Sequence, residues 1–158
     1  HMTIAPAEVS EDVAKEAHEL ALRLAQGFEL AGILAIELFV TKDERVIVNE
    51  LAPRPHNSGH YTIEACSFDQ FDAHIRGIAG WPLEQPELLK PAVMVNVLGQ
   101  HVAPTRALIA EHPEWNMHDY CKAEVRHDRK MGHITVLTDD TRQTVADLER
   151  TGCWDDLK

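Results

Sequence analysis

Residues 30–60 read LAGILAIELFVTKDERVIVNELAPRPHNSGH, and this stretch decides the fold. Two runs rich in branched apolar residues, 30–40 and 46–50, flank the polar segment TKDER, which is the pattern of a β-hairpin. The prolines and the glycine among the residues that follow oppose regular structure and predict a loop. The stretch therefore predicts two paired strands that lead into a loop with closely spaced polar side chains.

The predicted hairpin carries two carboxylates, Glu37 and Glu50. If residues 42–45 form a four-residue loop, the count along both strands places Glu37 opposite Glu50 and turns Asn49 to the other face. Facing carboxylates repel each other unless a cation lies between them, and oxygen ligands of this kind suit a Mg²⁺ ion that also holds phosphates. The spacing leaves two interpretations open, a metal site or two acids on a solvated sheet face.

Outside the hairpin, helical and strand patterns are mixed. Ser10 is the expected cap of a first helix, and Ser67 with Gln70 has capping-box spacing for a second helix that Gly80 ends. Residues 81–91 are the predicted linker. The mixture predicts an α+β fold. The predicted elements are helices from 10 to about 28, from 67 to 80, over 105–111 and over 141–151, and strands over 92–98 and 133–138.

The overall composition excludes several classes of protein. The chain has 158 residues, and its 26 acidic and 15 basic side chains give a formal net charge of −11, which argues against a nucleic-acid-binding surface. No apolar run approaches the ~20 residues that cross a bilayer. The three cysteines are scattered without a CxxC spacing, so a reducing cytosol is the expected location. The glycines form neither GxGxxG nor a Walker loop, so no nucleotide-phosphate cradle is recognisable.

The loop after the hairpin concentrates polar chemistry. Arg54 can clamp an anion, while His56 and Asn57 can orient a small polar substrate or transfer a proton. A zinc site on His56 and His60 is less favoured, because the i, i+4 spacing joins ligands on a helix and the local proline and glycine oppose one. A polar surface turn without a function is the alternative.

The charge reverses locally between residues 122 and 130. Four basic side chains accompany only two acidic ones there, which gives +2 within a chain of −11. A site for a phosphate monoester on a small substrate requires such a reversal, although a solvated strand face with alternating signs would produce the same pattern. The basic residues are Lys122, Arg126, Arg129 and Lys130.

Three segments of the chain resemble one enzyme family. They are GILAIELFV (32–40), NELAPRPHNSGHYTIEACSFDQFDAHIRGIAGWPL (49–83) and EVRHDRKMGHI (124–134). Together they look like N5-carboxyaminoimidazole ribonucleotide synthetase, the ATPase subunit of phosphoribosylaminoimidazole carboxylase. The resemblance covers nearly the whole chain from Thr3, but it corresponds to only the carboxyl-terminal part of that enzyme.

The resemblance implies a division of the chain. His1 and Met2 are interpreted as a tag scar, which together with a short lead-in fills residues 1–7. Residues 8–80 are implied to be the carboxyl-terminal half of an ATP-grasp domain. Residues 81–158 are implied to be a linker and a small β-rich carboxyl-terminal domain.

The resemblance also implies an activity. The family uses ATP to activate bicarbonate as carboxyphosphate, which the amine of 5-aminoimidazole ribonucleotide captures in purine biosynthesis. Mg²⁺ is the implied cofactor, ATP is a substrate, and a cytoplasmic homodimer that binds no nucleic acid and no membrane is expected. Because the nucleotide-gripping half would be missing, the fragment alone is expected to be inactive.

Individual roles follow from the same resemblance. Glu37 and Glu50 are the implied magnesium ligands, and Asn49 and Glu50 are the implied contacts to the nucleotide. The implied catalytic residues are Arg54, His56 and Asn57, which are also implied to bind the substrate together with Ser58. The implied contacts to the ribonucleotide phosphate are Lys122 and Arg129, with Lys130 beside them.

Two departures from the family pattern affect these roles. Ala52 stands where many ATP-grasp relatives carry an Asn, which leaves fewer protein ligands for the metal. His127 and Asp128 replace the Pro-Gly of EVRPGRK, and this replacement is expected to alter how Arg129 is presented. A different class of function is the alternative: a non-catalytic module that folds alone and mediates dimerisation or binding, with its site residues idle.

Overall fold

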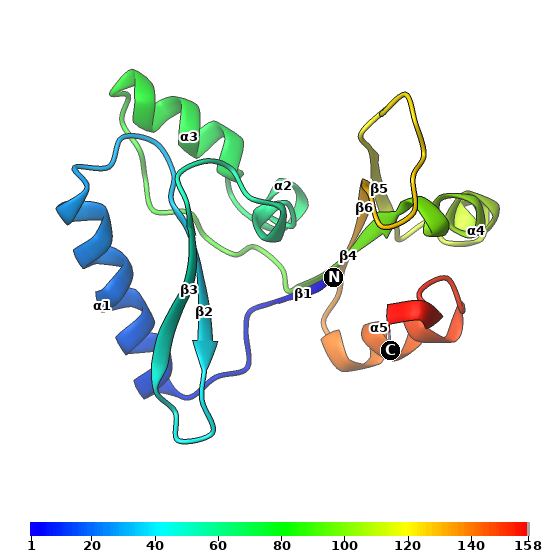
Figure 1. Cartoon of the computed structure of the whole chain (residues 1–158), viewed down its shortest axis with the longest axis horizontal. Coiled ribbons are helices and arrows are strands. Elements are labelled where there is room, and N and C mark those ends of the chain that lie inside the picture. The colour runs from blue at the N-terminus through cyan, green and yellow to red at the C-terminus, as the bar shows by residue number, and fades with distance from the viewer. Residues whose placement is uncertain (158) are drawn as a thin grey trace. The chain divides into compact units, whose positions relative to one another are not determined.

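The computed structural model describes residues 1–157, which form two compact units (Figure 1). The hairpin unit comprises residues 7–63 and 67–87, and the sheet unit comprises residues 1–6, 64–66 and 88 onward. Both units contain helices and strands, which confirms the α+β class. The helices are α1 (Glu11–Gly27), α2 (Thr62–Ala65), α3 (Gln70–Ala79), α4 (Val102–Leu108) and α5 (Thr141–Arg150), and the strands are β1 (Met2–Ala5), β2 (Ala35–Val40), β3 (Val46–Ala52), β4 (Ala92–Leu98), β5 (Asn116–Asp119) and β6 (Lys130–Leu137).

The hairpin unit contains the antiparallel ribbon of β2 and β3, with α1 packed beside it (Figure 1). Ser10 caps α1 as predicted, because its Oγ accepts a hydrogen bond of 3.3 Å from the N–H of Val13. The predicted first helix and hairpin are therefore confirmed. No helix within residues 1–157 is long and apolar enough to span a membrane.

The turn of the hairpin is shorter than predicted. The N–H of Thr41 donates to the carbonyl of Arg45 at 3.0 Å, so residues 42–44 form a three-residue loop. Glu44 at the end of this loop has a φ of 59°, the left-handed conformation that three-residue hairpin loops use in their last position. The predicted loop over residues 42–45 is therefore wrong.

A β-bulge in β3 compensates for the shorter turn. Leu38 lies opposite Val48, whereas Glu37 lies opposite Glu50, so Asn49 is the extra residue of the bulge. The predicted pairing of the two glutamates is confirmed, although two irregularities that sequence counting did not anticipate produce it.

The helix after the polar loop has a different cap from the predicted one. Asp69 is the N-cap, and its Oδ1 accepts hydrogen bonds of 2.7 and 2.9 Å from the N–H groups of Phe71 and Asp72. Ser67 Oγ instead accepts a hydrogen bond of 3.0 Å from the N–H of Glu87. The capping-box prediction is wrong, because Ser67 pairs with a segment twenty residues away and leaves the cap to the next strong capping residue.

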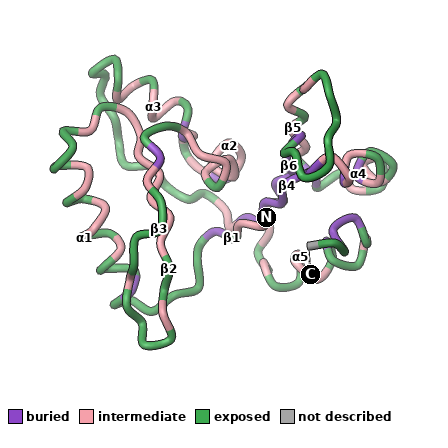
Figure 2. The backbone as a smooth tube through the Cα atoms, in the orientation of Figure 1, coloured by how far each residue is buried: buried purple, intermediate pink, exposed green. Residues whose placement is uncertain are grey.

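The sheet unit is a four-stranded antiparallel sheet in the order β1-β4-β6-β5. Every residue of β4 is buried, as its apolar run predicts, and buried residues continue along β6 (Figure 2). Val93, Val95 and Ile134 from these strands pack with Leu148 of α5 and with Trp154. The core of this unit therefore lies between the central strands and the carboxyl-terminal segment.

The two edge strands, β1 and β5, were not predicted. β1 forms from the lead-in at residues 2–5, and β5 has the polar sequence NMHD. Both strands hydrogen-bond to a buried central strand, which a local pattern does not reveal. At Gly132, a Cβ atom would lie 2.3 Å from the carbonyl oxygen of His118, so only glycine permits this approach of β5 to β6.

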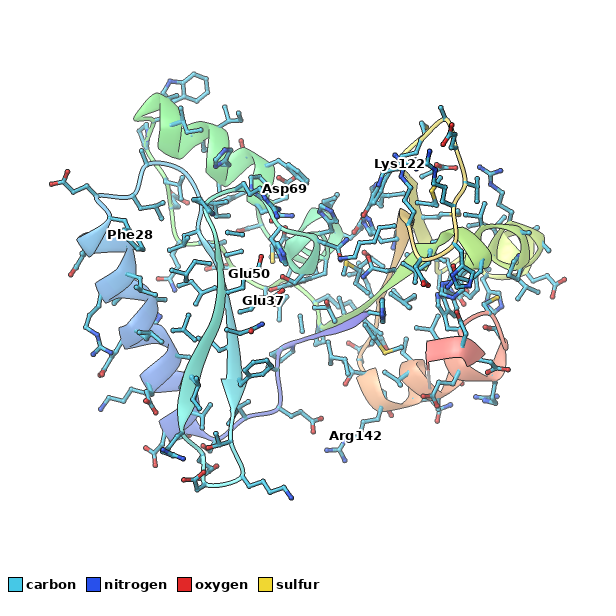
Figure 3. All side chains as sticks on the ribbon, viewed as in Figure 1. Phe28, Glu37, Glu50, Asp69, Lys122 and Arg142 are labelled. Atoms are coloured by element: carbon cyan, nitrogen blue, oxygen red, sulfur yellow. The ribbon has the colours of Figure 1, made fainter. Side chains whose placement is uncertain are left out.

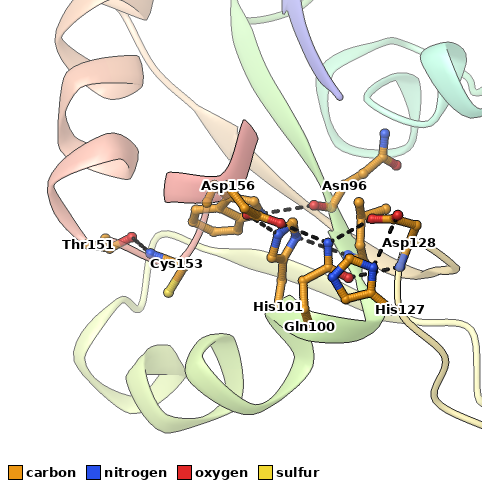
Figure 4. A network of polar contacts seen from close by, with 10 residues as sticks. Asn96, Gln100, His101, His127, Asp128, Thr151, Cys153 and Asp156 are labelled. Carbon is orange, nitrogen blue, oxygen red and sulfur yellow. Dashed lines mark hydrogen bonds and ion pairs between the residues drawn. The ribbon is translucent and has the colours of Figure 1, made fainter. Parts of the chain in front are cut away.

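A polar network joins the carboxyl-terminal segment to the end of β4 (Figure 4). Asp156 Oδ1 lies 2.7 Å from Nε2 of the buried His101, and its Oδ2 accepts a hydrogen bond of 2.8 Å from Gln100. His101 Nδ1 accepts from the N–H of Leu98, so Nε2 is the ring nitrogen that donates to Asp156. Hydrogen bonds from Gln100 and His101 hold the pKa of Asp156 below its ordinary value.

This network predicts an acid-dependent contribution to stability. A carboxyl whose pKa is lowered on folding stabilises the fold above its unfolded pKa and loses that contribution as the pH falls through the folded pKa. We expect Asp156→Ala to lower the melting temperature at pH 6, and we expect the difference from the wild type to shrink below about pH 4. Thermal unfolding of both proteins from pH 6 down to about pH 2 measures the effect. An equal difference at every pH would contradict it.

Candidate functional site

Two carboxylates face each other on the ribbon. Glu37 in β2 is paired with Glu50 in β3, so both side chains project from the same face (Figure 3). Asn49 Nδ2 donates to Glu37 Oε2 at 3.2 Å. The prediction that Asn49 lies on the opposite face is therefore wrong, because a bulge places two consecutive side chains beside one partner residue.

His56 from the polar loop approaches the same carboxylate. Its Nε2 lies 3.7 Å from Glu37 Oε1, and its Nδ1 lies 2.9 Å from Ser58 Oγ. The N–H of Ser58 also points at Nδ1, at 3.5 Å, so Nδ1 is the accepting nitrogen and Nε2 carries the proton of the neutral ring. The loop therefore presents an N–H donor, or after protonation a cation, beside the carboxylate pair.

Gln70 holds this loop in place, a role that its sequence position did not suggest. Its Oε1 accepts from the N–H of His56 at 2.9 Å, and its Nε2 donates to the carbonyl of His56 at 2.8 Å. Nε2 also lies 2.9 Å from Nδ1 of His60. A Cβ at Gly59 would lie 2.5 Å from Gln70 Oε1, so the amide and the loop fit closely together. The sequence shows only a polar residue at this position of α3, and the structure is needed to show that the residue is buried.

We expect Gln70→Leu to destabilise the hairpin unit. The leucine fills a similar volume but leaves the half-buried N–H and carbonyl of His56 without the amide, which costs about 1 kcal/mol of unfolding free energy. Urea unfolding measures the loss, and faster hydrogen exchange at the His56 amide localises it. Gln26→Leu on the exposed face of α1 is the matched control, with an expected change within about 0.5 kcal/mol. Unchanged exchange at His56 would show that Gln70 does not hold the loop.

The other loop residues lie nearby but differ in their surroundings. Arg54 is exposed, and its Nη1 donates to the carbonyl of Pro55 at 3.0 Å. Asn57 begins a short 3₁₀ turn and is half-buried. A cavity of about 260 Å³ opens beside this turn, with His56 and Ser58 on its polar side and residues 33–36 on its apolar side. The loop can thus place a small polar molecule against donor groups and an apolar wall.

The basic segment of the sheet unit is a loop between β5 and β6. Lys122 Nζ donates to the carbonyl of Lys130 at 2.6 Å and lies 5.5 Å from the centre of the Tyr120 ring. Arg129 Nη1 donates to the carbonyl of Glu124 at 3.1 Å. Arg129 and Lys130 are exposed and Lys122 is half-buried, so their cationic groups are available to an anion.

The turn before Arg129 has an aspartate in the left-handed conformation. Arg129 N–H donates to the carbonyl of Arg126 at 3.1 Å, and Asp128 has a φ of 59°. A type II turn requires a positive φ at its third residue, and glycine usually occupies that position. In this turn the third residue is Asp128. Gln100 supports the aspartate, because it accepts from the N–H of Asp128 at 2.9 Å and donates to its Oδ1 at 3.0 Å.

Comparison with known proteins places both units in one family. The ATP-grasp domain family matches residues 1–71, and the phosphoribosylaminoimidazole carboxylase C-terminal domain family matches residues 92–147. The N5-carboxyaminoimidazole ribonucleotide synthase of Staphylococcus aureus strain COL is 47% identical over 147 residues, which are 92% of this chain and 39% of that protein. The chain belongs to the N5-carboxyaminoimidazole ribonucleotide synthase family.

Solved structures of the synthase family share the fold described above. A synthetase in complex with ADP superimposes with a TM-score of 0.95 at 42% identity over 99% of this chain and 41% of that chain. The Aspergillus clavatus synthase in complex with ADP and 5-aminoimidazole ribonucleotide has a TM-score of 0.86 at 34% identity, over 95% of this chain and 42% of that chain. The chain thus spans about two fifths of the length of the synthases that it matches.

The residues to which the synthase resemblance assigns roles are distributed over both units. Those expected to bind metal, nucleotide and the reacting groups share the hairpin unit, whereas those expected to bind the ribonucleotide phosphate share the sheet unit. The first group is Glu37, Asn49, Glu50, Arg54, His56, Asn57 and Ser58, and the second is Lys122, Arg129 and Lys130.

The donor set on the ribbon suits the magnesium ion of an ATP-grasp synthase. Glu37 and Glu50 offer oxygen atoms only, which is what Mg²⁺ prefers, and two carboxylates leave room for waters and phosphate oxygens. Within residues 1–157, no three His, Cys, Asp or Glu side chains are grouped so as to hold a metal by themselves. His60, one of the two residues considered for zinc, has its Nδ1 beside Gln70.

Proposed function

We propose that this chain is part of an ATP-dependent ligase that carboxylates 5-aminoimidazole ribonucleotide with bicarbonate, through carboxyphosphate, in purine biosynthesis. The observation that carries the proposal is the facing pair Glu37 and Glu50, in a chain 47% identical to a named synthase. Two carboxylates in this arrangement need a cation, and phosphoryl transfer from ATP uses one. ATP and Mg²⁺ are accordingly the proposed substrate and cofactor.

Each group of residues has a task in this proposal. Glu37 and Glu50 would hold Mg²⁺, which supplies charge neutralisation during phosphoryl transfer. Arg54 would bind the bicarbonate or carboxyphosphate anion, and the Nε2–H of His56, which lies 3.7 Å from Glu37 Oε1, would donate to the same anion. Lys122 and Arg129 would bind the phosphate of the ribonucleotide. Binding energy at that phosphate helps to hold the amine in position for carboxylation.

A chimera tests the proposal directly. In it, this chain replaces the matching 39% of the Staphylococcus aureus synthase. The expected result is ATP-dependent incorporation of ¹³C-bicarbonate into 5-aminoimidazole ribonucleotide, with phosphate release that depends on the ribonucleotide. A folded chimera that incorporates no label, beside an active parent enzyme, would overturn the proposal.

Association through an exposed helix face is a second proposal, favoured by one observation. Phe71, Ile75 and Ile78 lie on one side of α3 and remain 41%, 58% and 58% exposed. We infer that this stripe contributes to a homodimer, which is also what a non-catalytic dimerisation module would need. Unchanged sedimentation of Ile75→Glu relative to the wild type would contradict it.

The cysteines bear on the location of the protein. Cys66, Cys121 and Cys153 are free thiols, which supports a cytoplasmic location.

A further inference from the structure

An aromatic ring lies under the cationic group of Lys122. The ammonium nitrogen is 5.5 Å from the centre of the Tyr120 ring, within the range of a cation–π interaction. The same nitrogen donates to the carbonyl of Lys130 at 2.6 Å. An ammonium group has three N–H bonds, so Lys122 can keep this hydrogen bond and still donate to an oxygen of a ligand. Two contacts therefore hold an otherwise flexible side chain in one place.

The Tyr120 ring is itself anchored in the core of the sheet unit. Its hydroxyl lies 2.9 Å from Nδ1 of His133, a residue only 1% exposed. The His133 ring stacks on that of His118, with centroids 4.6 Å apart and planes 13° from parallel. His118 Nε2 in turn contacts the carboxylate of Glu64. The Tyr120 ring under Lys122 is thus the last in a series of contacting rings that begins in the buried sheet.

The backbone turn between Tyr120 and Lys122 is also restrained. Cys121 has a φ of 52°, a left-handed conformation that a non-glycine residue adopts only at a cost. Its N–H donates to Oδ1 of Asp119 at 2.8 Å. This hydrogen bond, together with the guanidinium of Arg106, lowers the pKa of Asp119. The ionised carboxylate holds the turn. The restraint directs Lys122 back over the ring instead of into solvent.

We propose that Tyr120 is a positioning residue that holds the Lys122 ammonium group ready for a phosphate monoester, an inference that rests on the proposed function of Lys122. The physical reason is that a free lysine loses side-chain entropy when it binds, whereas one already seated on a ring and a carbonyl has lost most of it beforehand. Tyr120 acts through Lys122 and need not contact the substrate.

The test separates the ring from its hydroxyl. Tyr120→Phe keeps the ring, and Tyr120→Leu removes it. In the ligand-free chain, the ring should shift the NMR signals of the Lys122 ε-methylene group upfield in the wild type and in Tyr120→Phe, but not in Tyr120→Leu. Lys122→Met assigns the signal. Lys90, which lies beside Asp139 in the same unit, is the control whose signals stay unchanged.

Binding of 5-aminoimidazole ribonucleotide is the second readout. We expect Tyr120→Leu to weaken binding about fivefold and Tyr120→Phe to stay within about twofold of the wild type. A Lys122 signal at its random-coil position in the wild type would overturn the positioning role, and this outcome stands even if Tyr120→Leu does not fold. A wild-type upfield shift with equal ribonucleotide binding by wild type and Lys122→Met would instead refute the proposed phosphate contact alone.

Discussion

The 158-residue chain by itself is expected to carboxylate 5-aminoimidazole ribonucleotide at least about a thousandfold more slowly than a full-length synthase. The chain spans about two fifths of its relatives, so any group that the remaining three fifths contribute to the triphosphate is missing. Orientation and exclusion of water by such groups supply ~7 to 11 kcal/mol in enzymes, and losing half of that term accounts for the expected factor.

Phosphate release from ATP, with bicarbonate and the ribonucleotide present, measures this rate. The Staphylococcus aureus synthase is the positive control, and the chain must first be shown to unfold cooperatively so that inactivity is not loss of fold. Equal rates for the chain and the full-length enzyme would show that the remaining part of the relatives is dispensable. Weak binding of the ribonucleotide by the inactive chain agrees with the expectation, because Lys122 and Arg129 are present.

The second large effect is expected from Glu50→Gln in the chimera described above. The substitution removes one ligand charge from the facing pair and keeps the size of the side chain. Weaker metal binding then lowers the stabilisation of phosphoryl transfer by ~3 kcal/mol, which is roughly a hundredfold in turnover. Ribonucleotide affinity should change by less than about twofold, because the pair binds the metal and not this substrate.

Lys122→Ala should have the opposite kinetic signature. It should weaken ribonucleotide binding about tenfold while changing turnover at saturation much less. Glu19→Gln on the exposed face of α1 removes a glutamate charge away from the ribbon and should leave both constants unchanged. Steady-state kinetics with separate titrations of ATP and the ribonucleotide distinguish the two signatures. The same signature for Glu50→Gln and Lys122→Ala would contradict the division of roles proposed here.

Much of the hairpin unit could be predicted from local sequence. Ser10 caps α1, and β3 lies where the second apolar run predicts it, whereas β2 begins only at Ala35, five residues into the first run over 30–40. The pairing of Glu37 with Glu50 was also predicted correctly, but on the assumption of a regular ladder and a four-residue loop. A shorter turn and the bulge at Asn49 both occur, and their effects on the register cancel. Strand counting succeeds here because a single-residue bulge restores the parity that the turn removed.

The sequence by itself determined the family, the helices α1, α3 and α5, the strand β4 and the residue types of the candidate site, because periodicity and a distinctive motif are local properties of the chain. It did not predict α2, and it placed α4 three residues too late. Only the tertiary structure decided which polar groups meet. Gln70 reaches His56 across 14 residues, and Glu64 reaches His118 across 54. The edge strands β1 and β5 likewise exist because central strands pair with them. Contacts of this kind depend on packing between distant segments, and local propensity carries no information about them.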